Sequence, residues 1–252
     1  MQRDSCIVYE LQPVNLGANP NYSYVVRRAH GELLKCSASS DWYAPTFLKR
    51  FKDELLAFAD TVLVVPRSRL FQDSVSTAQD YTTNDIAVLD DAPVARLMSL
   101  MYNMFLNNVM NGLIRMSALR RTGLVETYHD GDVVLTAHLA LLGKFRLIDE
   151  RLNYRGMELG TATSMLNRAG VLQHYYPKLS QSTLFQITTC QTGWVRMVLA
   201  APLTFGERLR ALQFIAKRCY WERKRFLDKD LRGAWYYFTR GSWPDRAFID
   251  GG

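Results

Sequence analysis

Residues 32–66 read ELLKCSASSDWYAPTFLKRFKDELLAFADTVLVVP, and this stretch decides the fold class. Residues 32–38 and 61–66 are short and apolar, as buried strands are, whereas 46–59 repeat apolar residues every three or four positions, as an amphipathic helix does. The loop 39–45 ends at a proline and separates the first strand from the helix. A strand, a helix and a second strand in this order predict parallel strands joined by a crossover helix. The sequence therefore predicts an α/β fold.

The alternation continues on both sides of this stretch. Strands are predicted at 6–11, 112–116, 144–148 and 152–155, and helices at 20–29, 93–106, 117–122 and 132–142. Asn19 is the expected N-cap of the first of these helices, because Pro20 follows it at the first helical position. Residues 72–91 are rich in Ser, Thr and Asp and are expected to form a long surface excursion.

The last third of the chain has a different pattern. Helices are expected near 160–169, 181–200, 205–227 and 229–239. We therefore expect an α/β domain at 1–165 and a helical, basic extension at 166–252. Residues 206–232 hold nine basic side chains against four acidic ones. Such a segment either contacts phosphates or an anionic membrane surface, or is a solvated helix face, and no binding to nucleic acid is expected.

Composition narrows the class of protein. Of the 252 residues, 48% are hydrophobic and 22% are charged, which excludes the disordered and collagen-like classes. No run of about 18 apolar residues predicts a membrane span, and no apolar leader predicts secretion. The four cysteines (Cys6, Cys36, Cys190 and Cys219) form no C-x-x-C pair. We expect a cytoplasmic protein in a reducing compartment, with peripheral contact at the inner face of the membrane as an addition.

Two short acidic clusters are the candidate sites, because the common nucleotide-binding and hydrolase motifs are missing. Ser39-Ser40-Asp41 follows the strand at 32–38, at the edge where open α/β sheets bind ligands. Asp41 either holds a divalent ion that neutralises a diphosphate or caps the next helix. In His129-Asp130-Gly131-Asp132, Asp132 is either a general base or an N-cap, and a metal site from His129 and the two aspartates is a third alternative.

Five segments resemble family 2 glycosyltransferases, which are inverting enzymes with the GT-A fold, and they occur in the family's order. They are 15–22 (NLGANPNY), similar to the N-x-G-x-x-x-x-N segment; 31–45 (GELLKCSASSDWYAP), similar to the GEY strand and the D-x-D-like metal loop; 111–123 (NGLIRMSALRRTG), similar to the strand near the acceptor site; 131–145 (GDVVLTAHLALLGKF), similar to the helix with the catalytic base; and Tyr154-Arg155 with 161–163 (TAT), similar to the exit into the C-terminal tail.

The resemblance implies a Rossmann-like, three-layer α/β/α domain of the GT-A type. It would transfer a sugar from a nucleotide-sugar donor to a hydroxyl of a carbohydrate or lipid-linked acceptor, with inversion. Asp41 would bind Mn²⁺ or Mg²⁺, Ser40 would belong to the same donor-binding loop, and Asp132 would be the catalytic base. Arg155 would pair with phosphate or an acceptor carboxylate, the alternative being a structural salt bridge. Trp42 would stack on a sugar or fill the core, and His174 is a further candidate metal ligand.

Two departures from the family pattern qualify this expectation. Family members begin with two strand-and-helix units before the N-x-G segment, so the resemblance implies a domain that lacks its N-terminal nucleotide-binding part. In addition, Ser40 stands where many members have an acid. The alternative to an active transferase is therefore an inactive glycosyltransferase fragment or a binding module.

Overall fold

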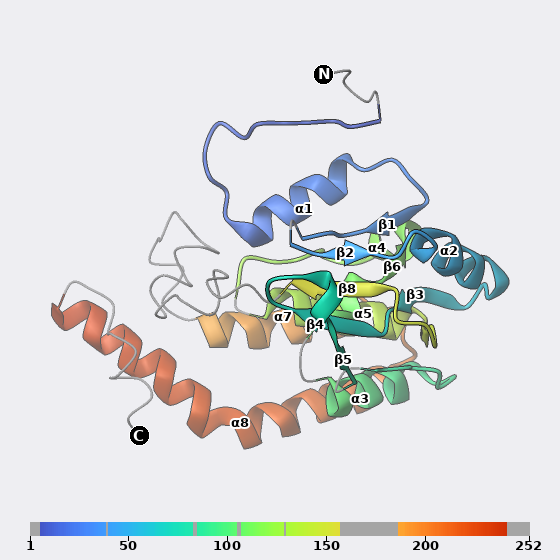
Figure 1. Ribbon diagram of the computed structural model, residues 1–252. Coiled ribbons are helices and arrows are strands. Elements are labelled where there is room, and N and C mark those ends of the chain that lie inside the picture. The colour runs from blue at the N-terminus through green and yellow to red at the C-terminus, as the bar shows by residue number, and fades with distance from the viewer. Residues whose placement is uncertain are drawn as a thin grey trace.

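The structure, a computed structural model, describes residues 6–38, 40–82, 85–104, 107–128, 130–156 and 186–240. It is a mixed α/β protein with two small sheets, one of which is packed between helices (Figure 1). The predicted α/β class is confirmed. The helices are α1 (Ala18–Arg28), α2 (Phe47–Ala57), α3 (Pro93–Asn103), α4 (Met116–Leu119), α5 (Gly131–Leu142), α7 (Gln186–Ala200) and α8 (Phe205–Arg240), with short 3-10 turns η1 (Val75–Thr77) and η2 (Asn108–Asn111).

The central sheet holds three strands that run in one direction. Its order is β1 (Leu33–Lys35), β6 (Leu113–Arg115), β3 (Thr61–Val65) and β7 (Lys144–Leu147). β3 pairs in parallel with β7, and β6 runs antiparallel to both β1 and β3. Because β6 is antiparallel to both β1 and β3, these two strands run in the same direction. β7 is parallel to β3, so β1, β3 and β7 all point the same way. Their carboxyl ends therefore meet at one edge of the sheet.

The two faces of this sheet carry different helices because side chains alternate along a strand. Leu63 and Val65 of β3 belong to the larger core, which they share with residues of α3 and α5. Val64 lies on the opposite face, in a second core with Phe47 and Phe51 of α2. The rings of Phe47 and Phe51 stack with their centroids 3.9 Å apart. The sheet is thus enclosed between α2 on one face and α3 and α5 on the other.

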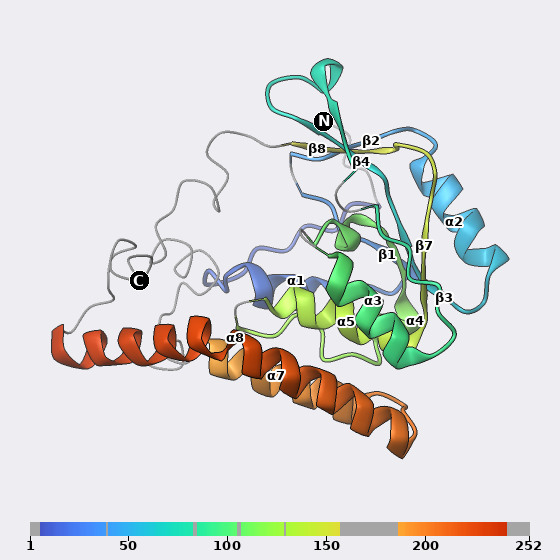
Figure 2. The ribbon, with the colours of Figure 1, turned by 90° about the horizontal axis from the view of Figure 1, so that it is seen from below.

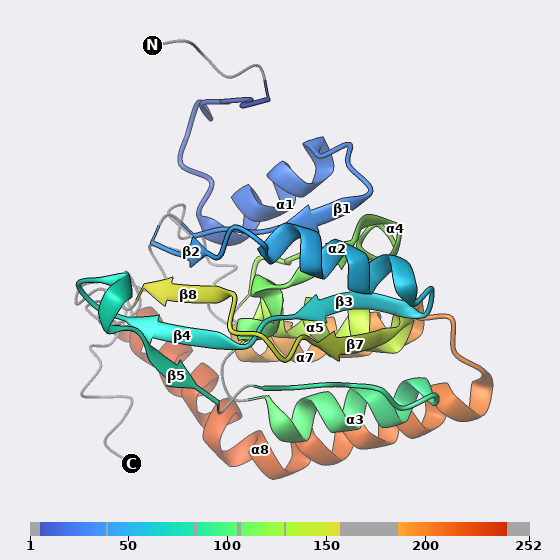
Figure 3. The same ribbon diagram turned by 45° about the vertical axis from the view of Figure 1, so that its right-hand side comes forward.

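α7 and the first half of α8 extend the larger core rather than forming a core of their own. Trp194 and Val198 of α7 and Ala211 and Ile215 of α8 are buried in the same cluster as Leu63. Figure 3 shows these two helices beneath α5 and α3. The predicted border between 1–165 and 166–252 falls outside the described residues and stays a prediction. Among the described helices, none combines the length and the apolar character that a membrane crossing requires.

A second, smaller sheet continues from the first. Its order is β2 (Trp42–Tyr43), β8 (Asn153–Gly156), β4 (Ser68–Phe71) and β5 (Gln79–Tyr81). β4 follows β3 after a short connection, and β8 follows β7 in the same way. β4 and β8 therefore pair in parallel, as β3 and β7 do. β2 is attached to the far side of β8 in antiparallel register. The small sheet therefore holds the segment around β2 close to the end of β8.

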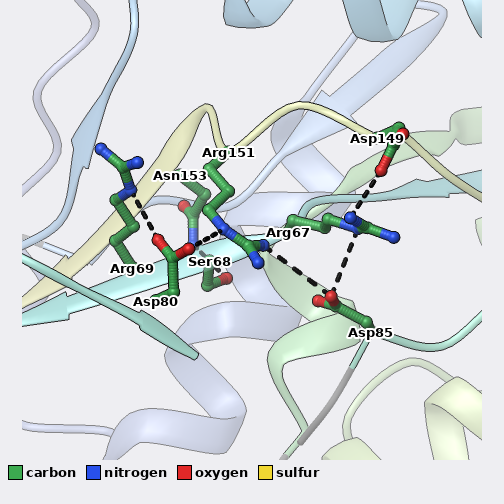
Figure 4. A network of polar contacts seen from close by, with 8 residues as sticks. All are labelled: Arg67, Ser68, Arg69, Asp80, Asp85, Asp149, Arg151 and Asn153. Atoms are coloured by element: carbon green, nitrogen blue, oxygen red, sulfur yellow. Dashed lines mark hydrogen bonds and ion pairs between the residues drawn. The ribbon is translucent and has the colours of Figure 1, made fainter. Parts of the chain in front are cut away.

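Charged side chains fix this small sheet (Figure 4). Arg67 lies 3.2 Å from Asp85 and 2.5 Å from Asp149, and Arg151 lies 2.7 Å from Asp80. Beneath them, the buried Asn153 side chain donates a 2.9 Å hydrogen bond to the Ser68 hydroxyl and ties β8 to β4. These contacts join the connections before β4 and β8, so they set where the end of β8 lies.

Most predicted elements are confirmed, with shifts of one to three residues at their ends, and three expectations are wrong. Residues 6–11 form no strand and expose Ile7, Val8, Tyr9 and Leu11. Gly17, not Asn19, is the N-cap of α1. The segment 72–91 is mostly exposed, as expected, and contains η1 and β5. The two helices expected at 205–227 and 229–239 are one continuous helix, α8, and the helix expected near 160–169 lies outside the described residues.

Candidate functional site

The carboxyl edge of the central sheet brings the two predicted clusters to the same side of the molecule. β1 ends at Lys35, and the chain passes through Cys36 to Ser40 and Asp41 beyond that edge. α5 ends at Leu142, and a single residue, Gly143, separates it from the start of β7 at Lys144. A helix that leads into a strand and packs on its sheet runs back along it, so the first turn of α5 lies at the carboxyl edge.

Tyr22 of α1 supports this placement because it is close to Cys36, which follows β1, and to Asp132 in α5. Burial raises the pKa of the Tyr22 phenol, and the neighbouring Cys36 thiol and Asp132 carboxylate raise that pKa further. The influence of both groups on one phenol places Cys36, which follows β1, near the first turn of α5. The Tyr22 side chain therefore lies near both Cys36 and Asp132.

Asp41 faces Arg155 across the small sheet. β2 pairs with β8 so that Trp42 lies opposite Tyr154. When this antiparallel register is continued by one and then two residues, Asp41 comes opposite Arg155 and Ser40 opposite Gly156, in agreement with the close approach of Gly156 to Ser40. Opposite charges in such a cross-strand position attract each other.

A glycine makes this close approach possible. A Cβ atom on Gly156 would lie 2.6 Å from the backbone oxygen of Ser40 and 2.9 Å from its Cβ atom. Every side chain other than hydrogen would therefore push the loop that carries Ser40 and Asp41 away from β8. The sequence resemblance did not single out Gly156.

Burial and the neighbouring polar groups shift the pKa of the Asp41 carboxyl in opposite directions. Burial raises the pKa of the Asp41 carboxyl, because a half-buried carboxylate loses solvation. The cations of Arg155 and Lys35, the backbone N–H of Gly156 and the Tyr43 hydroxyl lower the same pKa. The Tyr43 hydroxyl lies 3.5 Å from Asp41 Oδ2. Asp41 thus belongs to a compact group with two positive charges and one negative charge.

Lys35 is a member of the site that sequence reasoning missed. Its ammonium group donates hydrogen bonds to the Cys36 carbonyl and, at 3.1 Å, to the Tyr43 hydroxyl, and it lies 4.2 Å from the centre of the Tyr43 ring. Burial lowers the pKa of Lys35 to about 8, although Cys36 and Asp41 act in the opposite direction. The available signal was a lysine within the predicted strand 32–38, shortly before the loop that carries Asp41.

Asp132 lies in the first turn of α5 and is not its N-cap. The N-cap is Asp130, with φ 62°, and Asp132 is the second residue of the helix. The alternative that Asp132 is only a cap is therefore wrong. The Asn107 side-chain amide donates a 2.9 Å hydrogen bond to Asp132 Oδ2, and the Thr136 hydroxyl lies 3.1 Å from Asn107 Oδ1. Asp132 is half-buried, and Asn107 holds one of its two carboxylate oxygens.

The other predicted residues divide into three groups. Ser40 and Arg155 lie beside Asp41, as described above. Trp42 exposes 62% of its side chain next to the loop, so the expectation that it fills the core is wrong. Ser39, His129 and His174 lie outside the described residues.

The site suits an anion better than a metal ion bound by protein alone. In the part of the chain that the structure describes, no three His, Cys, Asp or Glu side chains gather as a metal site. A divalent ion at Asp41 would have one carboxylate and would be repelled by Lys35 and Arg155. A diphosphate removes this conflict, because its oxygens bind both cations and also complete the coordination of the ion. The donor set therefore fits a metal–diphosphate pair.

Sequence comparison with models of known protein families and with characterised proteins gave no match to either.

Proposed function

We propose that this protein transfers a sugar from a nucleotide-sugar donor to an acceptor hydroxyl, with inversion at the sugar carbon. The observation that carries the proposal is the grouping of Lys35, Asp41 and Arg155 beyond the carboxyl end of β1, with Asp132 in the first turn of α5 at the same edge of the sheet. The first group has the charges that a diphosphate requires, and the second is a carboxylate at the start of a helix. The resemblance to family 2 glycosyltransferases supports the same roles.

The donor diphosphate is the ligand of the first group. Lys35 and Arg155 contact its oxygens, and Asp41, with Ser40 beside it, holds the divalent ion that the diphosphate brings. Mn²⁺ or Mg²⁺ supplies positive charge to the leaving group when it is bound. The two side-chain cations stabilise the same developing charge without further reorganisation, because the contacts around Asp41 already fix them.

Asp132 accepts the proton of the acceptor hydroxyl. As the acceptor oxygen forms its bond to the sugar carbon, the bond from that carbon to the diphosphate oxygen breaks on the opposite side. The proton goes to Asp132 and the electron pair leaves with the nucleoside diphosphate. The amino end of α5 favours a negative charge at Asp132, and Asn107 holds one carboxylate oxygen. Trp42 offers an exposed ring on which a sugar of the donor or acceptor stacks.

Calorimetric titration with a panel of nucleoside diphosphates tests the first half of the proposal. We expect binding that requires Mn²⁺, with a Kd nearer 1 mM than 1 μM because Ser40 replaces an acid, at about 4 kcal/mol of binding free energy. Asp41→Asn and Lys35→Met should weaken it, whereas Lys52→Met, at an exposed position of α2, should not. Equal binding with and without metal would remove the role of Asp41. No binding to any nucleoside diphosphate would contradict the proposal and favour a binding module.

A further inference from the structure

The outer face of α8 carries large apolar side chains that solvent reaches. The exposed fractions are 57% for Tyr220, 72% for Trp221, 54% for Leu231, 62% for Trp235 and 70% for Phe238. Leu231, Trp235 and Phe238 follow one another at intervals of four and three residues, so they share one stripe of the helix. Tyr220 precedes Leu231 by eleven residues, which is about three helical turns, and joins the same stripe. We call these five residues the aromatic stripe.

The aromatic stripe is not the surface that attaches α8 to the rest of the protein. Ala211 and Ile215 make that attachment in the first half of the helix, and Asp230 and Ala234 are buried in the second half. Leu231 and Trp235 each lie one residue after a buried position, which turns them about 100° away from it. Figures 1 and 3 show α8 along the lower border of the molecule. In Figure 2 its second half extends past the sheets.

The charge of α8 is strongly positive. The helix contains ten basic residues and four acidic ones. Two of the acids are engaged within the protein, since Glu207 accepts hydrogen bonds from the backbone N–H and the hydroxyl of Thr204, and Asp230 is 2% exposed. Among the side chains of the helix that the structure describes, four basic residues are exposed: Arg210, Lys217, Arg232 and Arg240.

We propose that α8 docks on the surface of an anionic lipid bilayer, with the aromatic stripe at the level of the headgroups. Tryptophan and tyrosine rings concentrate at that level, and a helix that combines them with Lys and Arg lies in the plane of the interface. The positive charge makes a second copy of this chain an unsuitable partner for α8, because two such helices repel each other. Acidic lipids, in contrast, attract the helix. Leu231 and Phe238 are apolar and largely exposed, and acyl chains of the lipids would remove their exposed surface from water. This inference does not depend on the proposed sugar transfer.

Flotation of the full chain with vesicles tests the inference. We expect the protein to float with vesicles of equal parts phosphatidylcholine and phosphatidylglycerol, and to remain behind with phosphatidylcholine alone. Trp221→Ser with Trp235→Ser should reduce the bound fraction. Lys217→Glu with Arg232→Glu should weaken binding to the acidic vesicles by at least about twentyfold, since each basic residue contributes roughly a factor of five. Leu48→Ser with Leu56→Ser on α2 is the matched control, since those leucines are 60% and 62% exposed.

Fluorescence gives a second readout. Brominated lipid should quench tryptophan emission of the parent chain and of the α2 control, but much less in Trp221→Ser with Trp235→Ser. Circular dichroism should show that all variants keep their helix content, because the substituted side chains are exposed. The inference is wrong if the parent chain fails to float with acidic vesicles, or if both α8 variants float as it does. It is also wrong if loss of the stripe abolishes a dimer, or binding to a single-stranded RNA, without changing flotation.

Discussion

The Asn107 side-chain amide donates a 2.9 Å hydrogen bond to one carboxylate oxygen of Asp132. The two residues are 25 positions apart in the sequence, and the segment around η2 brings them together at the first turn of α5. The Thr136 hydroxyl lies 3.1 Å from Asn107 Oδ1 and donates at 2.8 Å to the Asp132 carbonyl. Since the amide has its oxygen toward Thr136, its NH₂ group is directed at Asp132. The orientation of the proposed base is thus fixed by two polar neighbours.

We expect Asn107 and Asp132 to be energetically coupled. A hydrogen bond to a charged group contributes about 1.5–3 kcal/mol in proteins, and removal of either partner loses it. Asn107→Ala and Asp132→Ala should each destabilise the protein, and the double variant should cost less than the sum by about 1 kcal/mol or more. Urea denaturation of the four proteins measures this difference. Strict additivity would mean that the two side chains do not interact in solution.

Replacement of the proposed base should separate chemistry from folding. Asp132→Asn keeps the size of the side chain but cannot accept a proton, so sugar transfer should fall by about 10²–10⁴ in rate. The melting temperature should change little, because Asp132 is not the N-cap of α5. Asp130→Asn is the control for charge at the same helix end. If Asp132→Asn retains full turnover while Asp130→Asn loses it, Asp130 is the base.

Binding of a diphosphate should weaken as the pH rises through about 8. Burial lowers the pKa of Lys35 to about 8, and only the protonated ammonium group attracts an anion. Affinity should therefore be constant below that pH and fall above it. Lys35→Arg keeps its charge throughout this range and should abolish the dependence. Calorimetric titration of a nucleoside diphosphate with Mn²⁺ at pH values from 7 to 9 provides the measurement. A dependence that persists in Lys35→Arg would assign it to another group.

The buried histidine of α5 should make the protein sensitive to acid. His138 is 4% exposed, and burial, with a smaller contribution from Arg121, lowers its pKa to about 4. In the unfolded chain a histidine titrates near 6.5. Between these two values the unfolded state binds more protons, so the free energy of unfolding is largest above pH 6.5 and falls as the pH decreases toward 4.

The expected loss from His138 is up to about 3 kcal/mol. Denaturant titrations at pH 7, 6 and 5 should show the loss in the parent protein and a flatter profile in His138→Leu. Arg121→Gln, which keeps the buried imidazole, should leave most of the slope in place. An unchanged slope in His138→Leu would place the acid sensitivity elsewhere.

Because Gly156 lies so close to Ser40, we expect a single methyl group added at Gly156 to destabilise the protein. Gly156→Ala would insert a Cβ atom 2.6 Å from the Ser40 backbone oxygen, so β8 and the loop must separate. We expect a destabilisation of about 1–3 kcal/mol and weaker binding of a diphosphate. In Gly206→Ala the added methyl meets no atom within 4 Å, and this control should be neutral or slightly stabilising. Thermal melts and the calorimetric titration would compare them.

Local pattern was enough for the elements that a hydrophobic core requires. The apolar run at 61–66 predicted β3, and the spacing of apolar residues by three and four at 46–59 predicted α2. Both patterns follow directly from which side chains are buried. The same reasoning failed at 6–11, which has the composition of a strand but no partner strand in the structure. Within the exposed segment 72–91, it gave no sign of β5, whose polar residues form a strand by pairing with β4.

The sequence by itself determined the α/β class, the position of Asp41 after a strand and the position of Asp132 at the start of a helix. Only the tertiary structure decided which residues surround them. Arg155 lies opposite Asp41 because β2 and β8 pair in one register, and Lys35 joins them because β1 ends beside that pair. Asn107 reaches Asp132 from a separate segment of the chain. Such contacts depend on strand pairing and packing between distant residues, which a local spacing pattern does not contain.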